Sequence, residues 1–502
     1  MLAQQEARSP EWVAYLLCIV GIWAILVGVY VRAGSFHAEF AGADEAAYVV
    51  SSIMVREYLA GPLWHGVSPI AFAQLYYDNY PKVAIGHWPP VYFVVQSAWL
   101  LLTGVSRPAL LVLSALLSTL LASLTMLLCR REGLRWSMAA TAGVVTVLLP
   151  IHIRSLLELG SDIMASITIL VATLCCQRWI AQQNRRNSMW FAASVAIAVL
   201  TKGTAFVLFL VAPMALLLTQ KRLASMWSRE TWRVVMWSVV LALPWYFFAA
   251  RWLQGEIVPG PPGHLVGSIL NAVQRNTWTF LSLCGIAMLP MALVSLRSEW
   301  HRRAPAVAVL PIATWLFLTI LSPHTEARLF MPMVPGVVFA GAVAASSLLP
   351  RIQELVMIAA LLISYVNVHV TTKAAVGFLP AVAWMVSAPH EPSRGILVSS
   401  NGGKEGALIS EFALRQPLPQ RAIVRASKVL ESSTWMGDNA QLLARSAADA
   451  ARIVDEHHIS LVVRHVSPSG ATELYGRSLD EMLSHWQLLR EFGEVRIYGR
   501  TH

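Results

Sequence analysis

The chain alternates long apolar runs with short polar loops from its first residues to about residue 371. Many of the runs reach roughly 18 residues, the length that an α-helix needs to cross the apolar core of a bilayer. The first, WVAYLLCIVGIWAILVGVYV at 12–31, is longer than the apolar part of a signal peptide, and no small-residue cleavage site clearly follows it. We therefore interpret it as a retained span, and the whole pattern predicts a polytopic α-helical membrane protein.

Charged loops divide the apolar part of the chain into about eleven predicted spans. The basic loops are 129–135, 177–187, 220–233, 297–303 and a weak one at Arg351. They alternate with loops that are poor in Lys and Arg, and because basic loops stay on the cytoplasmic side, the N-terminus is placed inside. The predicted spans are 12–32, 108–129, 136–153, 162–179, 188–201, 203–219, 232–250, 274–296, 304–321, 328–348 and 352–371.

One apolar stretch, 89–104, is only about 16 residues long and does not fit as a span. A crossing there would turn every later basic loop to the outside. We predict instead a helix that lies in the outer interface of the membrane, with Trp88 and Trp99 as aromatic anchors. Residues 33–107 would then form one large extracytoplasmic loop that carries interfacial helices near 43–60 and 89–104.

The net charge of +10 does not indicate nucleic-acid binding, because of where the charge lies. Residues 391–502 hold 13 Lys and Arg against 13 Asp and Glu, so the whole excess falls in the membrane part, mostly in its short loops. That distribution follows the positive-inside rule. The five Cys all lie in or at the ends of apolar runs and predict neither a disulfide framework nor a Cys metal site.

The tail after residue 390 has a pattern typical of a small α/β domain. Short β runs are expected at 395–400, 422–427, 460–465 and 495–500, with amphipathic helices at 405–415 and 447–458 between them. An odd number of spans places this tail outside. The predicted division is a membrane domain at 1–389 and a C-terminal extracytoplasmic domain at 390–502. The stretch NGGKEG at 401–406 lacks the spacing of a phosphate-binding loop.

Isolated polar residues near the predicted span ends collect on the outer side of this topology. Ionisable groups at membrane depth are costly and usually either carry function or pair with one another. The candidates are Asp44, Glu45, Tyr48, Lys82, His87, Asp162, Lys202, His324, Glu326 and Arg328.

These residue types suit a substrate with a lipid tail in the bilayer and an anionic head above it. Lys and Arg would hold a phosphate or pyrophosphate, and an Asp can take the proton of an acceptor hydroxyl as it attacks an anomeric carbon. Asp44 and Tyr48 are four residues apart and share a face of a helix, whereas Glu45 turns aside. Three acids near one site would also allow a divalent cation, although the ligand set is incomplete.

Each candidate also has a purely structural interpretation. An Asp-Glu pair before a helix is commonly an N-cap followed by a first-turn acid. Lys202 and Arg328 would serve as snorkelling interfacial anchors. Asp162 would cap its helix, and His87 would be a structural residue. Only the joint placement of the whole set on one side of the membrane favours function.

Five short motifs occur in the same order as in a known family. They are DEAAY at 44–48, KVAIGHW at 82–88, Asp162 at the start of a span, LTKG at 200–203 and EARLFMPMVP at 326–335. WRVVMWSVVLALPWYF at 232–247 adds a span that ends in Leu-Pro-Trp-Tyr. Over residues 10–350 the chain thus resembles the GT-C glycosyltransferases that include bacterial aminoarabinose transferases and protein O-mannosyltransferases.

The resemblance implies an inverting transferase at the outer leaflet of the bacterial cytoplasmic membrane. Its donor would be a polyprenyl-phosphate sugar, and its acceptor a lipid, glycan or protein. Asp44 maps to the catalytic acid of the family and Lys82 to the residue that binds the donor phosphate. Glu45 stays open between orienting Asp44, binding the acceptor and capping the helix. The predicted site is catalytic Asp44 and Glu45, with Lys82, His87, Asp162, Lys202, Arg328 and Tyr48 binding substrate.

Two positions depart from the family pattern, and both bear on donor identity. Family members often have Arg where this chain has Ala47, and Tyr where it has Leu329. A transporter or flippase of lipid-linked sugars is the main alternative, beside a hydrolase of such substrates and a non-catalytic membrane partner. A transporter favours polar groups in mid-membrane segments and a repeat between halves, and the sequence contains neither clearly.

The topology predicts the side from which single Cys probes react in a Cys-free background. Probes at Ser400 and Pro261 should be labelled from outside, and a probe at Asn184 only from inside, because it lies in a basic loop. Labelling of intact and opened cells with a membrane-impermeant maleimide measures this. Labelling of Asn184 from outside would contradict the whole arrangement.

Overall fold

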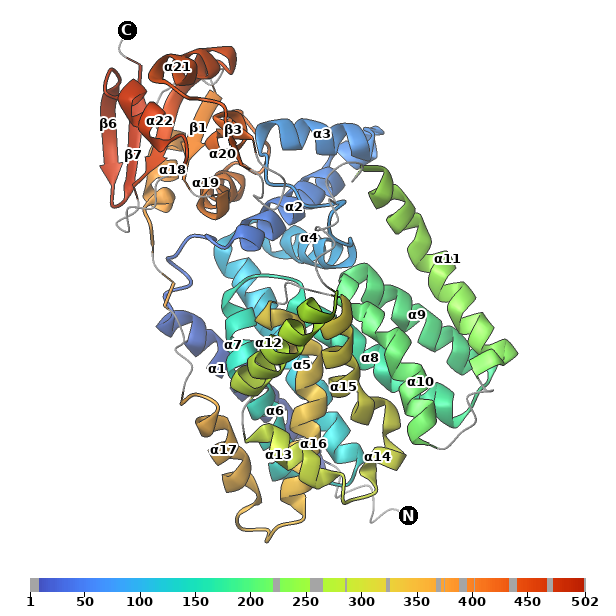
Figure 1. Ribbon diagram of the computed structural model, residues 1–502. Coiled ribbons are helices and arrows are strands. Elements are labelled where there is room, and N and C mark those ends of the chain that lie inside the picture. The colour runs from blue at the N-terminus through green and yellow to red at the C-terminus, as the bar shows by residue number, and fades with distance from the viewer. Residues whose placement is uncertain are drawn as a thin grey trace. The chain divides into compact units, whose positions relative to one another are not determined.

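The chain forms two compact units, each built from several stretches of sequence (Figure 1). The first comprises Met1–Tyr30, Gly86–Tyr92 and Val112–Thr371, and the second comprises Val31–Ile85, Phe93–Leu111 and Thr372–His502. The computed structural model describes residues 9–219, 226–252, 265–284, 287–321, 326–366, 372–373, 375–387, 395–400, 402–432, 440–466 and 473–500. Pro261, His324 and the end of the last predicted span, 367–371, lie outside these ranges.

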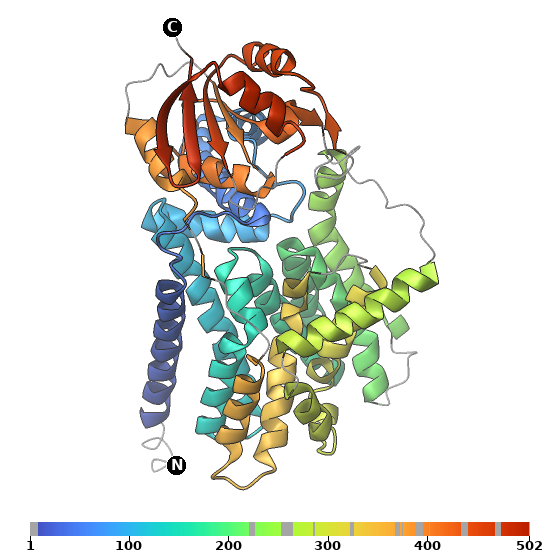
Figure 2. The ribbon, with the colours of Figure 1, turned by 60° about the vertical axis from the view of Figure 1, so that its left-hand side comes forward.

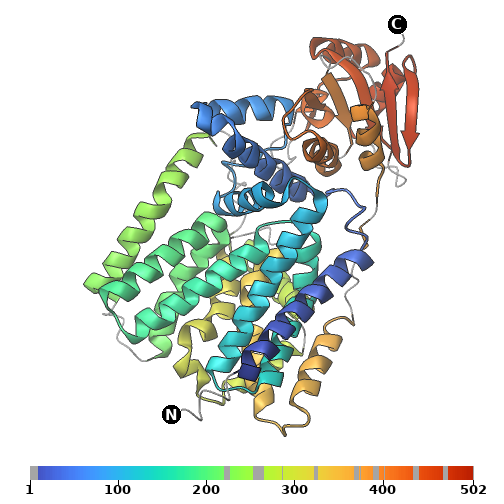
Figure 3. The same cartoon turned by 180° about the vertical axis from the view of Figure 1, so that it is seen from behind.

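The first unit is a bundle of apolar helices (Figure 3). Its elements are α1 (Ser9–Arg32), α5 (Arg107–Arg131), α6 (Trp136–Leu148), α7 (Pro150–Leu157), α8 (Asp162–Ala181), α9 (Arg185–Thr201), η4 (Gly203–Val207), α10 (Leu208–Leu218), α11 (Arg229–Trp252), α12 (Leu265–Cys284), α13 (Met288–Ser295), α14 (Trp300–Arg303), α15 (Pro305–Leu321), η6 (Ala327–Met333), α16 (Val334–Ser346) and α17 (Gln353–Ile363). α8 packs against α9, and α9 packs against α11. The core between them includes the buried side chains of Ile169, Trp179 and Phe191.

Five helices within the described ranges are long and apolar enough to cross a membrane. They are Trp12–Arg32, Arg107–Arg131, Asp162–Ala181, Arg229–Arg251 and Ala327–Ser346, and the bent pair of α6 and α7 makes a sixth if it counts as one span. The predicted count of eleven is therefore not confirmed. Other apolar helices, such as Gly203–Leu218 and Pro305–Ile320, are shorter than the roughly 20 residues of a straight span.

The bend between α6 and α7 has a local cause. The two helix axes differ by 53°. Pro150 is the first residue of α7 and has no N–H to donate to the preceding turn, so the helix is interrupted there. The hydroxyl of Tyr365 donates to the carbonyl of Leu148, which satisfies an acceptor beside the break.

The second unit joins the first predicted outer loop to the tail of the chain. This grouping differs from the predicted division at residue 390, because the tail packs against the loop. The loop contains α2 (Ala43–Ala60), η3 (Pro62–His65), α3 (Pro69–Asn79) and α4 (Val91–Thr103). The predicted helices near 43–60 and 89–104 are thus present as α2 and α4, and their depth in a membrane stays a prediction.

The tail folds into a five-stranded sheet with helices on both faces (Figure 2). Its elements are α18 (Phe378–Ser387), β1 (Gly395–Ser399), α19 (Gly402–Arg415), β2 (Ile423–Arg425), α20 (Ala426–Val429), β3 (Glu431–Ser432), β4 (Gln441–Leu442), α21 (Ala447–Glu456), β5 (Ile459–His465), α22 (Gly476–Leu483), β6 (Gln487–Phe492) and β7 (Val495–Gly499). The strand order is β2-β1-β5-β7-β6. β1 is parallel to β2 and β5, whereas β7 is antiparallel to β5 and β6.

The register of the sheet separates two apolar faces. Leu397 of β1 lies opposite Val424 and Val462, and it packs into a core that α20, α21 and α22 supply. On the other side α19 contacts β1, and α18 contacts both α19 and the β6–β7 pair. Ser400, which follows β1, is fully buried, so a labelling probe there would be hidden; the exposed Gln420 is a better position in the same tail.

A buried carboxylate holds the loop and the tail together within the second unit. Glu39 is 1% exposed, and it accepts backbone N–H groups at the start of α18. The donors are Val376, Gly377 and Leu379, at 2.8, 3.0 and 3.1 Å. These N–H groups have no partner inside the helix, and the helix dipole favours a negative charge there. Glu39 therefore caps α18 from a segment more than three hundred residues away in sequence.

Candidate active site

The first turn of α2 carries the two adjacent acids. Gly42 is the N-cap residue, and Glu45 at the third helical position accepts its backbone N–H at 3.2 Å. Glu45 is 3% exposed and also forms an ion pair with Lys373. Its carboxylate is thus engaged in a cap and a charge pair, which is the structural alternative that the sequence left open for this residue.

Asp44 and Tyr48 lie on one face of α2, as their spacing predicts. Asp44 is partly exposed, whereas Tyr48 is 3% exposed. The ring of Tyr48 packs against Phe93 of α4 with centroids 5.7 Å apart. A helix face fixed by this packing holds the Asp44 carboxylate at a defined place at the start of α2.

Lys82 follows α3 on a segment without helix or strand that contacts α2. The segment is fixed by two hydrogen bonds: the Lys82 N–H donates to Tyr80 O at 2.7 Å, and the Ala84 N–H donates to Ser51 Oγ at 2.8 Å. The Lys82 side chain reaches the backbone of α19 at Gly406. A Cβ atom built at Gly406 would lie 2.9 Å from Lys82 Cε and 2.9 Å from the Cβ of Ala46.

The surroundings of Lys82 disfavour its positive charge. Burial lowers the pKa of the Lys82 amine from the ordinary value of 10.5 to about 8, and the like charge of Arg425 adds to that lowering. Glu405 and Asp44 act in the opposite direction, and Lys428 contributes a further small lowering. Asp44 and Lys82 therefore interact electrostatically, so the structure brings the predicted acid and the predicted cation into one neighbourhood.

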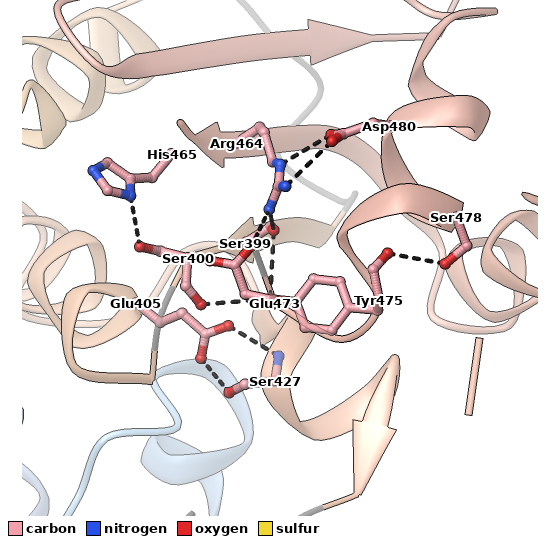
Figure 4. A network of polar contacts seen from close by, with 10 residues as sticks. All are labelled: Ser399, Ser400, Glu405, Ser427, Arg464, His465, Glu473, Tyr475, Ser478 and Asp480. Carbon is pink, nitrogen blue, oxygen red and sulfur yellow. Dashed lines mark hydrogen bonds and ion pairs between the residues drawn. The ribbon is translucent and has the colours of Figure 1, made fainter. Parts of the chain in front are cut away.

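A buried network in the tail supports this side of α19 (Figure 4). Glu405 is fully buried, and its carboxylate accepts from the Ser427 N–H at 2.9 Å, from the Ser427 hydroxyl and from Arg425 Nε at 2.9 Å. Burial raises the pKa of the Glu405 carboxyl, and the Arg425 charge opposes that rise. Glu405 and Arg425 were missed by sequence reasoning, because nothing in a single sequence connects α19 and β2 to residue 82.

The same network continues across the carboxyl ends of β1 and β5 (Figure 4). Arg464 is paired with Glu473 at 2.8 Å and Asp480 at 3.0 Å. The side chain of His465 lies 3.0 Å from the Ser400 hydroxyl and 2.9 Å from Glu494. Ser400 and His465 are each at most 2% exposed, so these groups build the interior of the tail.

Two predicted residues pair with each other in the first unit. Asp162, the first residue of α8, and Lys202, which follows α9, form an ion pair with Nζ and Oδ1 2.5 Å apart. Asp162 is 4% exposed, so the pair keeps its charge compensated in an apolar setting. The two side chains therefore pair with each other. The sequence alone had allowed separate structural roles, with Asp162 capping its helix and Lys202 snorkelling to the interface.

Arg328 and His87 also belong to the first unit. Arg328 lies in η6, and its Nε is 2.5 Å from the exposed carboxylate of Glu326. His87 is partly exposed and follows Gly86, whose φ of +106° lies in the region that favours glycine. The predicted set is thus divided by unit: Asp44, Glu45, Tyr48 and Lys82 lie in the second unit, and His87, Asp162, Lys202 and Arg328 lie in the first.

In the part of the chain that the structure describes, the acids near α2 form no recognisable metal site. Within the described ranges, no three His, Cys, Asp or Glu side chains are grouped closely enough to hold a metal ion. The divalent cation that the sequence allowed therefore has no identified ligand set in this part of the chain. A carboxylate such as that of Asp44 can accept a proton, and a cation such as Lys82 can bind an anion.

Solved structures identify the architecture that carries these residues. ArnT from Cupriavidus metallidurans in the apo state superposes with a TM-score of 0.63 at 14% identity, over 99% of this chain and 98% of ArnT. ArnT from the same organism bound to undecaprenyl phosphate gives the same score and identity, over 98% of each chain. This chain has the GT-C fold.

A second GT-C protein supports the same assignment. The archaeal oligosaccharyltransferase AglB from Archaeoglobus fulgidus, in complex with an inhibitory peptide and a dolichol-phosphate, has a TM-score of 0.52 at 12% identity. That similarity covers 96% of this chain and 74% of AglB. The sequence itself matches no protein-family profile and no curated protein. The predicted fold class, a helical GT-C membrane protein with a small C-terminal sheet, is confirmed.

The surroundings of Lys82 predict an unusual titration. After reductive methylation with a ¹³C label, the Lys82 resonance should titrate with a midpoint near pH 8, because burial and Arg425 destabilise the charged amine. The amine is charged below that pH and neutral above it. Asp44→Asn should move the midpoint lower, because it removes an acid that favours the charge. The loss of one signal in Lys82→Arg assigns the resonance, and a midpoint above 10 would contradict the described environment.

Proposed function

We propose that the chain is an inverting glycosyltransferase that moves a sugar from a polyprenyl-phosphate donor to a lipid, glycan or protein acceptor. The proposal rests on one observation: in a GT-C fold, a partly exposed carboxylate, Asp44, lies near a partly buried cation, Lys82. ArnT, which shares the fold, has been solved with undecaprenyl phosphate, and AglB with a dolichol-phosphate. We place the reaction at the outer face of the bacterial cytoplasmic membrane, where the positive-inside rule puts the first loop.

The chemistry follows from the two charges. The acceptor hydroxyl attacks the anomeric carbon of the donor from the side opposite the phosphate, and its proton passes to the Asp44 carboxylate. The bond between the anomeric carbon and the phosphate oxygen breaks, and polyprenyl phosphate leaves with the bonding electrons. Lys82 would stabilise the negative charge that develops on that phosphate. A single displacement of this kind inverts the anomeric configuration.

Transfer by purified protein is the direct test of this function. The protein in detergent or nanodiscs is given a polyprenyl-phosphate sugar together with candidate lipid, glycan and protein acceptors. Formation of a glycosylated acceptor with release of polyprenyl phosphate supports the proposal. Release of free sugar would indicate a hydrolase, and movement of intact donor across the bilayer would indicate a transporter.

Asp44→Asn should abolish transfer while leaving expression and fold intact. The amide keeps the size of the side chain and a hydrogen-bonding oxygen at the start of α2, but it cannot take a proton from the acceptor. Loss of a general base typically lowers the rate by ~10²–10⁴. Asp78→Asn, at an exposed acid of α3, is the matched control and should keep full activity. Near-normal transfer by Asp44→Asn would restrict Asp44 to a structural role.

Lys82→Ala should lower the affinity for the donor more than it lowers the rate of sugar transfer from donor that is already bound. A lost charge-assisted contact in a partly desolvated site costs on the order of 1.5–3 kcal/mol. Lys82→Arg should restore affinity only in part, because a planar guanidinium differs from a point charge. Titration of undecaprenyl phosphate against each variant measures this, with Arg445→Ala, at an exposed residue, as control.

Arg328→Ala tests the second cation that the family motif assigns to the donor, and it should also lower affinity. Unchanged affinity in both Lys82→Ala and Arg328→Ala would place the donor phosphate elsewhere.

A further inference from the structure

α19 of the tail approaches α2 and Lys82 through a glycine. The two helices pack along each other, and Gly406 lies at the contact. Any Cβ at this position would come to 2.9 Å from Lys82 Cε and from Ala46 Cβ, and to 3.3 Å from Lys82 Cδ. Real Cβ contacts below 3.0 Å are essentially never seen, so a larger residue would displace either the lysine or the helix. The absence of a side chain at Gly406 thus allows the Lys82 side chain to pass close to the backbone of α19.

α19 is held in place from both of its ends. At its first turn, buried Glu405 is bound to Ser427 and Arg425. Toward its C-terminus, Glu411 is 1% exposed and pairs with Arg107 and with Arg415.

Just beyond the helix, the Tyr80 hydroxyl donates to Gln416 O at 3.0 Å. Tyr80 is only two residues from Lys82. α19 and the residue that follows it therefore hold the segment that carries Lys82, and α19 also contacts the Lys82 side chain at Gly406.

We propose that α19 forms one wall of the donor-phosphate site, and that Gly406 is a positioning residue for Lys82. The proposal rests on the proposed function and extends it, because it makes the C-terminal α/β region part of the site. A lysine has four rotatable side-chain bonds, and their freedom must be lost when the amine binds a fixed anion. The backbone of α19 at Gly406 restricts the alkyl chain of Lys82 before the ligand binds. This restriction lowers the conformational entropy that is lost on binding.

The tail also controls the charge around the lysine. Arg425 and Lys428 oppose the Lys82 charge, whereas Glu405 and Asp44 favour it. Three of these four groups come from the tail, so removal or displacement of α19 would change both the position and the charge of the Lys82 amine. We expect an anionic ligand to bind here, because its negative charge would offset the repulsion between the neighbouring cations.

Gly406→Ala tests the positioning role. The variant should lower the affinity for undecaprenyl phosphate about tenfold, which is about half or more of the free energy that loss of the whole charged contact costs. In a background of Lys82→Ala with Ala46→Gly, the same substitution should have no further effect on affinity, because both side-chain groups that the new Cβ would meet are gone. Gly61→Ala is the matched control: Gly61 lies in the same unit, and a Cβ there meets nothing within 4 Å.

The titration of Lys82 provides a readout that does not depend on the ligand. The added methyl group should push the amine toward water, so the ¹³C-methyl midpoint should rise above 8 in Gly406→Ala and stay unchanged in Gly61→Ala. If Gly406→Ala does not fold, the double variant Gly406→Ala with Ala46→Gly restores space against α2 and keeps the contact with Lys82. That double variant should then show the same affinity loss and the same titration shift.

The outcomes separate the two proposals. If the wild type fails to bind undecaprenyl phosphate, the proposed function is overturned, and the donor wall with it. If the wild type binds but the Lys82 midpoint and the affinity are unchanged in the alanine variants, only the role of Gly406 is overturned. An equal affinity loss in the presence and absence of Lys82 would also overturn it, because the effect would then not pass through the lysine.

Discussion

The close approach of α19 to α2 at Gly406 is the contact on which the candidate site depends. It places two segments that are more than three hundred residues apart against the same lysine. The contact exists because Gly406 and Ala46 present almost no side chain, so the two backbones come together without a gap. Glu411 and Glu39 then anchor the tail to the loop through buried carboxylates, and Glu405 ties α19 to Ser427 and Arg425 within the tail. Lys82 is shielded from water by this assembly rather than by its own sequence neighbours.

Charge compensation is the rule in both units. Asp162 pairs with Lys202 in the first unit, and Glu45 pairs with Lys373 in the second. An uncompensated buried charge costs several kcal/mol, so such pairs contribute mainly by avoiding a penalty. Lys82 differs because burial, together with the like charges of Arg425 and Lys428, disfavours its charge, whereas Glu405 and Asp44 favour it. An amine whose charged and neutral forms are close in free energy responds strongly to an added anion, which is why Lys82 is the centre of the functional proposal.

Local patterns in the sequence predicted much of the fold. Apolar length indicated the helices, the four-residue spacing placed Asp44 and Tyr48 on one face, and alternation in the tail predicted β1 and β5. β6 was not predicted, because most of its residues are exposed and it carries no continuous apolar pattern. The order of the motifs along the chain favoured the GT-C fold, and the solved structures confirm that fold.

Long-range contacts were beyond the sequence for a physical reason. The pairing of Glu45 with Lys373, and the approach of Gly406 to Lys82, depend on how the tail docks on the loop. Spacing along a chain constrains neighbours within a helix or strand, but it carries no information about partners hundreds of residues away. The number of spans could not be predicted for a similar reason. Hydropathy detects an apolar run such as 136–157 as one stretch, but a proline inside that run interrupts the helix.

Recognition of a lipid phosphate is the central claim, and discrimination between two lipids tests it most directly. Native mass spectrometry of the full chain, with equal amounts of undecaprenyl phosphate and undecaprenol, compares ligands that share the same tail. The account predicts that the phosphorylated lipid is retained in preference to the alcohol, and that the preference is lost in Lys82→Ala. Equal retention of both lipids by the wild type would show that the tail alone is recognised, and it would contradict the account.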